Sequence, residues 1–512
     1  MNNKVTEDNK LEQTENNGQA SSYRSIFKAS SLFGGVQVYQ ILIGIIKSKF
    51  IAVLLGPAGM GIQGLYQSTL DMIKSVSALG LGQSAVRDIS EANGSGDQQR
   101  IGKTVAIVSR LVWFTGLSGL VITLFLSPLL SKLTFGNSDY TWGFVILSST
   151  LLFNQLCAGQ KVVLQGMRRL KDLAKASAIG STIGLLASIP LYYWFGVKGI
   201  VPTMVIISLA AMFLSWFYTR RIPIAKEKVS IQQAVASGRS MMKMGVSMSV
   251  SSILVTLFSY VLRWFIRNQG GVDEVGLFTA GFVIVNTYVG MVFTAMSTDY
   301  YPRLAAVNRD NGRSNEIINQ QGEIAVLILS PIVISCIVLM PFLIKLIYSE
   351  KFLPANDFVM YAVTGTLFKA ASWVMSFRFL AKAESGLFII NETIANIYIL
   401  LLNILGYYVG GLTGLGISFA IGNLSYLIQV LIISKKRYGF RFSQAFQRIY
   451  SVQLFFVIIC LILSILIQRN YWFYLTAAFV FLSCLFFSLK ELDKRISIFE
   501  LVKKTIFGRG RS

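Results

Sequence analysis

Charged side chains stand inside long apolar segments of this sequence, where they could bind an ion or a charged substrate. Most of them are basic; Asp71 is the main acidic residue and Glu392 a second candidate. A Lys, Arg or Asp at the centre of a membrane helix costs about 2.5–3.5 kcal/mol even on permissive scales, so such residues usually serve a function. The basic positions are Lys47, Lys49, Lys74, Arg110, Lys161, Arg263, Lys369 and Arg378.

Helical spacing groups many of these charges with other polar residues. At 100° per residue, Gln40 and Lys47 share one face, Asp71 and Lys74 share another, and Arg263 follows a run of Ser and Thr at the same spacing. Such stripes predict a wet interior rather than a lipid-facing surface. The predicted cavity residues are Gln40, Lys47, Lys74, Lys161, Arg263, Asn286 and Lys369, and Asp71 is the candidate for ion coupling.

Each of these residues also has a structural interpretation. Asp71 and Lys74 lie three residues apart and could simply neutralise one another. Lys47 and Arg263 lie in the outer halves of their helices and could reach the lipid headgroups. Lys49 and Arg378 lie off the polar stripes, so for them we favour contact with lipid headgroups or pairing between helices. We expect Arg110, on an apolar face, to be a structural partner of another residue.

A cavity with this excess of positive charge suits an anionic substrate. A pyrophosphate leaves water only when Lys, Arg or other donors meet it, and the Gln, Asn, Ser and Thr stripes offer partners to a glycan. The sequence has no His, its four Cys lack metal or redox spacing, and no Walker-type glycine-rich loop is present. We therefore predict no catalytic residue, metal site or cofactor.

The elements that must position these residues are membrane-spanning helices. Hydrophobic residues make up 54% of the 512 and charged residues 14%. A soluble protein needs a largely polar surface, so this composition indicates a membrane protein. About 20 mostly apolar residues cross a bilayer as a helix. We predict an all-α polytopic membrane protein with about fourteen crossings, at 30–55, 62–89, 101–130, 141–166, 173–195, 200–218, 244–266, 275–301, 317–347, 358–381, 386–408, 412–433, 450–467 and 471–489.

The net charge of +23 is mainly an orientation signal. Lys and Arg concentrate in alternate connections, for example 168–175, 220–243 and 435–448, whereas the intervening connections carry few, such as Lys132 and Lys198. This positive-inside pattern places both termini in the cytoplasm, and nucleic-acid binding is not needed to explain the charge.

A weak internal repeat divides the chain into halves. Residues 59–66 (GMGIQGLY) open the second crossing and residues 274–281 (EVGLFTAG) open the eighth. Two parallel six-helix lobes would follow from such a repeat. We predict a disordered cytoplasmic tail (1–29), an N-lobe (30–219), a cytoplasmic linker (220–243), a C-lobe (244–434), two further helices with a basic connector (435–490) and a basic cytoplasmic tail (491–512).

Three segments resemble the Wzx-type O-antigen translocases of the multidrug/oligosaccharidyl-lipid/polysaccharide (MOP) exporter superfamily. They are residues 48–61 (SKFIAVLLGPAGMG), 165–170 (QGMRRL) and 295–304 (AMSTDYYPRL), and the resemblance extends from about Ser30 to Arg437. It implies a MATE/MOP-like fold of two six-helix lobes around a central cavity, in which Lys47, Lys74 and Arg263 would be the cationic residues. The last two helices depart from the common twelve-helix pattern and are similar to the additional pair of lipid II flippases.

The resemblance also implies a function and partners. The chain would flip an undecaprenyl-pyrophosphate-linked oligosaccharide from the cytoplasmic to the outer leaflet of a bacterial inner membrane, by alternating access. Membrane lipid, a polysaccharide polymerase and a chain-length regulator are the further partners it suggests. A MATE-type multidrug or cation antiporter is the first alternative. A membrane polysaccharide polymerase or glycosyltransferase is the second, although the outer connections are short for an enzyme.

Overall fold

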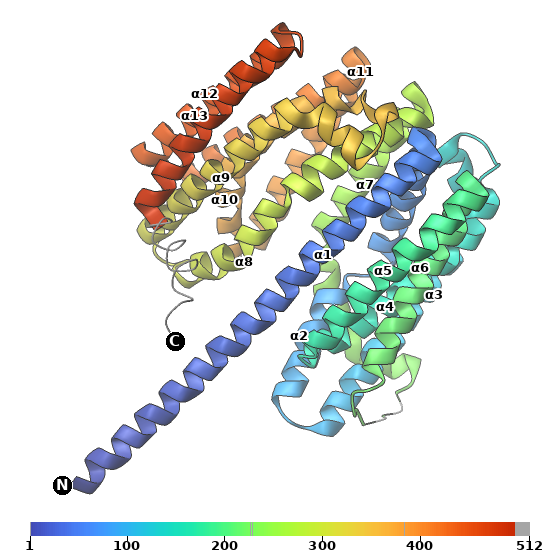
Figure 1. Ribbon diagram of the computed structural model, residues 1–512. Coiled ribbons are helices and arrows are strands. Elements are labelled where there is room, and N and C mark those ends of the chain that lie inside the picture. Colours follow the sequence, from blue (N-terminus) through green and yellow to red (C-terminus); the bar gives the residue numbers. More distant parts are fainter. Residues whose placement is uncertain (1, 226, 228, 383, 497–512) are drawn as a thin grey trace. The chain divides into compact units, whose positions relative to one another are not determined.

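Every regular element that the structure describes is a helix (Figure 1). The structure, a computed structural model, describes residues 2–225, 227, 229–382 and 384–496. The helices are α1 (Asn2–Ser77), α2 (Leu81–Gly94), α3 (Gln98–Phe135), α4 (Thr141–Gly166), α5 (Leu170–Phe195), α6 (Ile200–Thr219), α7 (Ile231–Val283), α8 (Met291–Ala306), α9 (Asn311–Ile347), α10 (Ala355–Ala381), α11 (Ser385–Tyr438), α12 (Gln444–Leu466) and α13 (Tyr471–Ile496), with single turns at η1 (Gly196–Gly199), η2 (Ile284–Val289) and η3 (Glu350–Phe352).

Four helical runs are too long to be single crossings. Ten described runs are apolar enough to span a membrane, and four of these contain 43, 50, 55 and 54 residues. At 1.5 Å per residue each would exceed ~60 Å, twice the ~30 Å of a hydrocarbon core. Each is interrupted at a glycine of positive φ, namely Gly56, Gly196, Gly271 or Gly411. Counting each interrupted run as two crossings gives fourteen, so the predicted polytopic all-α architecture is confirmed.

The interruptions recur in the same order in both halves of the chain. The first and second crossings meet at Gly56, and the seventh and eighth meet at Gly271. The fifth and sixth meet at Gly196, and the eleventh and twelfth at Gly411. The third and fourth crossings are joined instead by residues 136–140, and the ninth and tenth by residues 348–354, which include the short turn η3. This correspondence supports the internal repeat that the sequence suggested.

Several predicted boundaries differ from the structure. The predicted crossing 62–89 ends at Ser77, because Leu79 and Gly80 adopt left-handed φ values, and α2 begins as a separate helix at Leu81. The second half of the predicted linker, from Ile231, is helical in α7, because Ala234 and Met241 are buried against the core of the preceding helices. The helix α1 begins at Asn2, where we predicted a disordered tail; Glu, Lys and Gln favour helix, and no Pro precedes Pro57.

The chain divides into two compact units that follow the predicted lobes with one exchange. Unit 1 contains Met1–Phe50 and Leu70–Ser249, and unit 2 contains Ile51–Thr69 and Val250–Ser512. The tip of the first helical hairpin thus belongs to unit 2. Glycines allow this close approach: a Cβ on Gly276 would lie 1.9 Å from the Pro57 carbonyl oxygen, and one on Gly61 would lie 2.0 Å from that of Val272.

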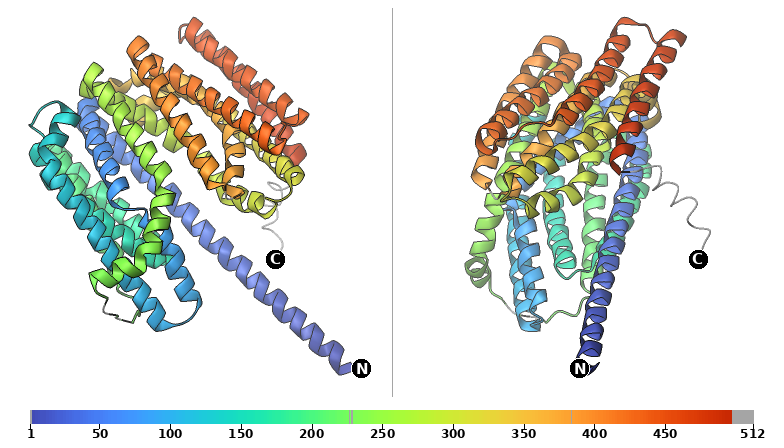
Figure 2. Two further views of the ribbon diagram at one scale, coloured as in Figure 1. Left: turned by 180° about the vertical axis from the view of Figure 1, so that it is seen from behind. Right: turned by 90° about the vertical axis from the view of Figure 1, so that its left-hand side faces the viewer.

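Unit 2 includes the two additional helices, α12 and α13, which pack on α9 and on each other (Figure 2). Two buried carboxylates hold the end at which α12 begins and α13 finishes. The Arg495 guanidinium lies 2.7 Å from Glu323 of α9 and 2.7 Å from Glu491 of its own helix. Asn319 of α9 accepts a hydrogen bond from the Ser443 amide that opens α12, at 2.8 Å. The predicted basic tail lies outside the described residues beyond Ile496.

Candidate functional site

The predicted cavity residues divide between the two units. Five lie in unit 1 and three in unit 2. Arg263 is buried, with 9% of its surface exposed, and the other seven are half-buried. Unit 1 carries Gln40, Lys47, Asp71, Lys74 and Lys161, and unit 2 carries Arg263, Asn286 and Lys369.

The three lysines of the unit 1 set form no ion pair with a carboxylate in the part of the chain that the structure describes. Among the described residues, no hydrogen bond or ion pair involves the ammonium group of Lys47, Lys74 or Lys161. Asp71 makes an interaction of its own, but it forms no ion pair with Lys74 within the described residues. The structural pair with Asp71 is therefore not formed, and a role for Lys74 in binding an anion stays a prediction.

Arg263, in the part of α7 that precedes Gly271, lies against aromatic rings. Its Nη1 donates to the Ser259 carbonyl oxygen at 3.2 Å and also to the Ser259 hydroxyl. The guanidinium carbon is 5.4 Å from the ring centroids of both Phe278 and Phe282. Cation–π contact of this kind holds a guanidinium without neutralising its charge. Arg263 therefore remains a candidate for binding an anionic group.

Asn286 lies in the π-helical turn η2, where the eighth crossing departs from α geometry. Its Nδ2 donates to the Phe282 carbonyl oxygen at 3.4 Å, and Gly290 follows directly after the turn. Insertions of this type within α-helices occur often at functional sites, because they displace side chains and loosen the backbone ladder. No periodicity in the sequence signals the turn.

The Lys369 ammonium, on α10, lies near an aromatic ring and a carboxylate. It is 5.6 Å from the Phe293 ring centroid and interacts electrostatically with Glu392 of α11. Glu392 accepts a hydrogen bond from the Tyr426 hydroxyl and lies 3.4 Å from the Asn391 Nδ2. From the sequence, Glu392 was only a possible counter-charge for the basic residues. Helical spacing could not identify its partner Tyr426, because the two residues are 34 positions apart in the chain.

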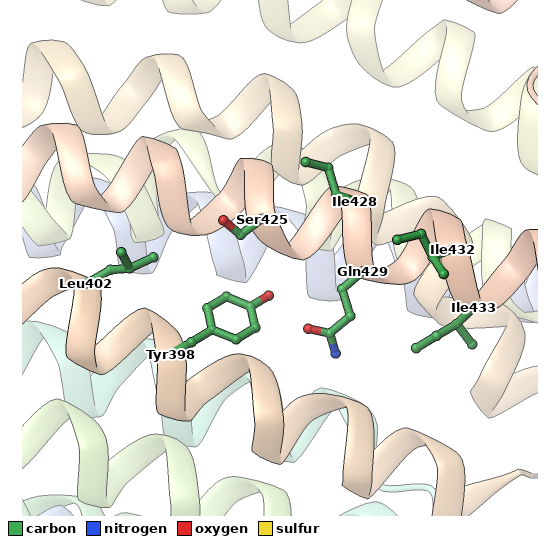
Figure 3. Close-up of a pocket in the computed structure, with 7 residues that line it drawn as sticks. All are labelled: Tyr398, Leu402, Ser425, Ile428, Gln429, Ile432 and Ile433. Atoms are coloured by element: carbon green, nitrogen blue, oxygen red, sulfur yellow. The ribbon is translucent and has the colours of Figure 1, made fainter.

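A pocket opens beside this cluster, between the two halves of α11 (Figure 3). Its volume is about 550 Å³, and its lining comprises three polar residues and four aliphatic ones. Figure 3 shows the Tyr398 hydroxyl and the Gln429 amide directed into the gap between the two helices. The lining residues are Tyr398, Leu402, Ser425, Ile428, Gln429, Ile432 and Ile433.

Two charges away from the stripes have structural surroundings of different kinds. Arg378 is only 1% exposed. Its guanidinium donates to Asn315 Oδ1 at 2.7 Å and to the Asn311 carbonyl oxygen at 3.2 Å, and it lies over the ring of Tyr438. Arg378 thus joins three helices, in agreement with the predicted pairing between helices. Arg110 is exposed and forms no ion pair with a described residue, so the structural partner expected for it is not found there.

Comparison with known sequences and structures gives consistent matches. A family model described as "Polysaccharide biosynthesis protein" matches residues 50–357. Lipid III flippases of Escherichia coli (strain K12) and Shigella flexneri are each 24% identical over 377 residues, covering 72% of this chain and 88% of the relative.

Solved structures of the MOP superfamily share the fold. An inward-facing multidrug resistance MATE family transporter superposes with a TM-score of 0.69 at 15% identity, covering 80% of this chain and 96% of the other. The lipid II flippase MurJ, in an inward closed conformation, gives a TM-score of 0.65 at 14% identity, covering 91% and 98%. The predicted MATE/MOP-like fold is therefore confirmed, including the pair of helices beyond the common twelve.

Proposed function

Since this chain belongs to the polysaccharide biosynthesis protein family, we propose that it flips a saccharide linked to undecaprenyl pyrophosphate from the cytoplasmic to the outer leaflet of a bacterial inner membrane. The match to lipid III flippases over most of the chain carries this proposal. An O-antigen or related surface polysaccharide repeat unit is the cargo we favour. A polysaccharide polymerase and a chain-length regulator would act on the product.

The charges of both units support an anionic cargo. Lys47 and Lys74 have no carboxylate partner among the described residues, and the Arg263 guanidinium is held by a hydroxyl, a carbonyl oxygen and aromatic rings. A pyrophosphate bound by such groups regains the hydrogen bonds that it loses on leaving water. Gln40, Asn286, Lys161 and Lys369 would add contacts to the saccharide or the phosphates.

The mechanism we propose is alternating access without covalent chemistry. The pyrophosphate would enter from the cytoplasmic side, the glycan would occupy the polar interior, and the polyprenyl chain would remain in lipid. Parallel repeats that move against one another can expose one site to each side in turn. Asp71 stays a candidate for coupling this movement to an ion.

A flipping assay tests the site. We expect Lys47→Ala, Lys74→Ala and Arg263→Ala each to lower the transport of undecaprenyl-pyrophosphate-linked N-acetylglucosamine in proteoliposomes by about ten- to a hundredfold, since a hydrogen bond to a charged group contributes about 1.5–3 kcal/mol. Lys132→Ala is the matched control, because Lys132 is exposed near the end of α3. Wild-type rates in all three variants, at equal amounts of protein, would refute the site.

A MATE-type exporter of drugs or cations is the second candidate, favoured by the fold alone. The same proteoliposomes distinguish it: transport of a hydrophobic organic cation, with no flipping of the lipid-linked sugar, would support the exporter. The relatives found are flippases and transporters, so we do not propose a polymerase or glycosyltransferase.

A further inference from the structure

Glu392 is an acidic side chain within a membrane crossing, and the proposed cargo does not need it. It lies half-buried in the first half of α11, and its charged or titratable neighbours are Lys369 of α10, Tyr426 of the second half of α11 and Tyr398 of its own helix. Holding a carboxylate away from water costs several kcal/mol unless its surroundings compensate. Carboxylates in such positions commonly belong to proton or ion pathways.

The groups directed at Glu392 are suited to a carboxylate and not to a metal cation. The Tyr426 hydroxyl and the Asn391 Nδ2 are hydrogen-bond donors, and the Lys369 ammonium carries a positive charge. A hard cation needs several oxygen acceptors around it, and a nearby ammonium repels it. The ion that can reach and neutralise this carboxylate without rearranging its partners is a proton.

The pocket between the halves of α11 provides a route. Gln429 lines the pocket, and its Nε2 donates to Asn391 Oδ1 at 2.8 Å and to the Asn391 carbonyl oxygen at 3.1 Å. Asn391 precedes Glu392 in the chain, so a pocket residue is hydrogen-bonded to the residue beside Glu392. The Tyr398 hydroxyl is buried and has no hydrogen-bond partner among the described residues. A volume of about 550 Å³ far exceeds the ~30 Å³ of one water, so the pocket has room for water beside its polar residues, Ser425 and Gln429.

We propose that Glu392 binds a proton that arrives through this pocket, and that its protonation drives the transport cycle. The proton adds to one carboxylate oxygen, and no other covalent bond changes. The ionised form accepts from Tyr426 and Asn391 and attracts Lys369, which ties α10 to both halves of α11. The protonated form loses that attraction and one acceptor, so the three helical segments are held less firmly. This coupling role rests on the proposed function; the proton site itself does not.

The first experiment detects the proton without transport. In pH-difference infrared spectra of the protein in nanodiscs, we expect the carbonyl band of a protonated carboxylic acid, shifted by a buried environment, to titrate in the wild type and to disappear in Glu392→Gln. Glu316→Gln is the control, because Glu316 is an exposed carboxylate near the start of α9. Persistence of the band in Glu392→Gln, or its absence from the wild type, would overturn the proposal.

A second measurement tests the route. Ser425→Cys should react with a charged, membrane-impermeant thiol reagent if water fills the pocket, while the four native cysteines, all buried, give the background. Protection of this cysteine under all conditions would exclude the route and overturn the proposal as stated.

The transport arm separates failure of the proton site from failure of the proposed function. With undecaprenyl-pyrophosphate-linked N-acetylglucosamine in proteoliposomes, an imposed pH gradient should accelerate flipping by the wild type several-fold and leave the slower flipping by Glu392→Gln unchanged. A sodium gradient should accelerate neither. If the wild type flips no lipid-linked sugar while the infrared band still depends on Glu392, the proposed cargo is refuted and the proton site is retained. If both proteins flip the sugar at rates that do not change with the pH gradient, the proposed coupling is refuted.

Discussion

Arg378 shows how this protein keeps a buried charge without a carboxylate. Its guanidinium is almost completely buried and is held by the Asn315 side chain, the Asn311 carbonyl oxygen and the Tyr438 ring. These groups lie on α9 and at the end of α11, while Arg378 lies near the end of α10. One side chain therefore joins three helical ends within unit 2.

Replacing Arg378 should destabilise unit 2. We expect Arg378→Ala to lower the free energy of unfolding by about 2–4 kcal/mol, because two hydrogen bonds from a charged donor are lost at a site with no access to water. Thermal unfolding of the purified protein in detergent measures the change. Arg437→Ala is the control, since its guanidinium is 55% exposed in its ion pair with Glu384, and we expect little or no change there. Equal melting temperatures for both variants would contradict the role of Arg378.

At the scale of elements, glycines decide how the helical runs turn and how closely they approach. A single glycine of positive φ reverses the chain at Gly56, Gly271 and Gly411, where any other residue would be strained. Gly61 and Gly276 allow the two hairpin tips of unit 2 to touch backbone to backbone.

Adding a single methyl group at this contact should separate the hairpin tips. We expect Gly276→Ala to lower stability by about 1–3 kcal/mol, since its Cβ would meet the rigid Pro57 carbonyl oxygen at 1.9 Å and backbone must move. Gly386→Ala is the matched control: a Cβ there meets nothing within 4 Å, so this helical position should be neutral or slightly stabilised. Thermal unfolding compares the two, and indistinguishable variants would show that the close approach is not needed.

At the scale of the whole molecule, an even number of crossings puts both termini on one side of the membrane. The excess of Lys and Arg in alternate connections predicts that this side is the cytoplasm. We expect an alkaline phosphatase fusion after Ser512 to be inactive and a fluorescent protein fusion there to be bright, with the reverse for insertions at Asn137, between α3 and α4. Activity of the phosphatase at both positions would disprove the even count or the orientation.

Reasoning from the sequence predicted a polytopic all-α membrane protein, about fourteen crossings, a weak internal repeat and the charged candidate residues. Each depends on composition or on spacing along one helix: apolar length sets a crossing, and a Lys or Asp within it is visible wherever the helix packs. The sequence also placed Arg378 off the polar stripes, where the structure finds it joining helices.

Which of these charges has a partner depends on contacts that form on folding. Glu392 meets Tyr426 and Lys369, and residues 51–69 leave their own half to pack on α7, through contacts between segments far apart in the chain. Helical periodicity fixes the face on which a side chain lies but not the helix that covers that face, because the energy of a buried charge depends on neighbours brought together by folding.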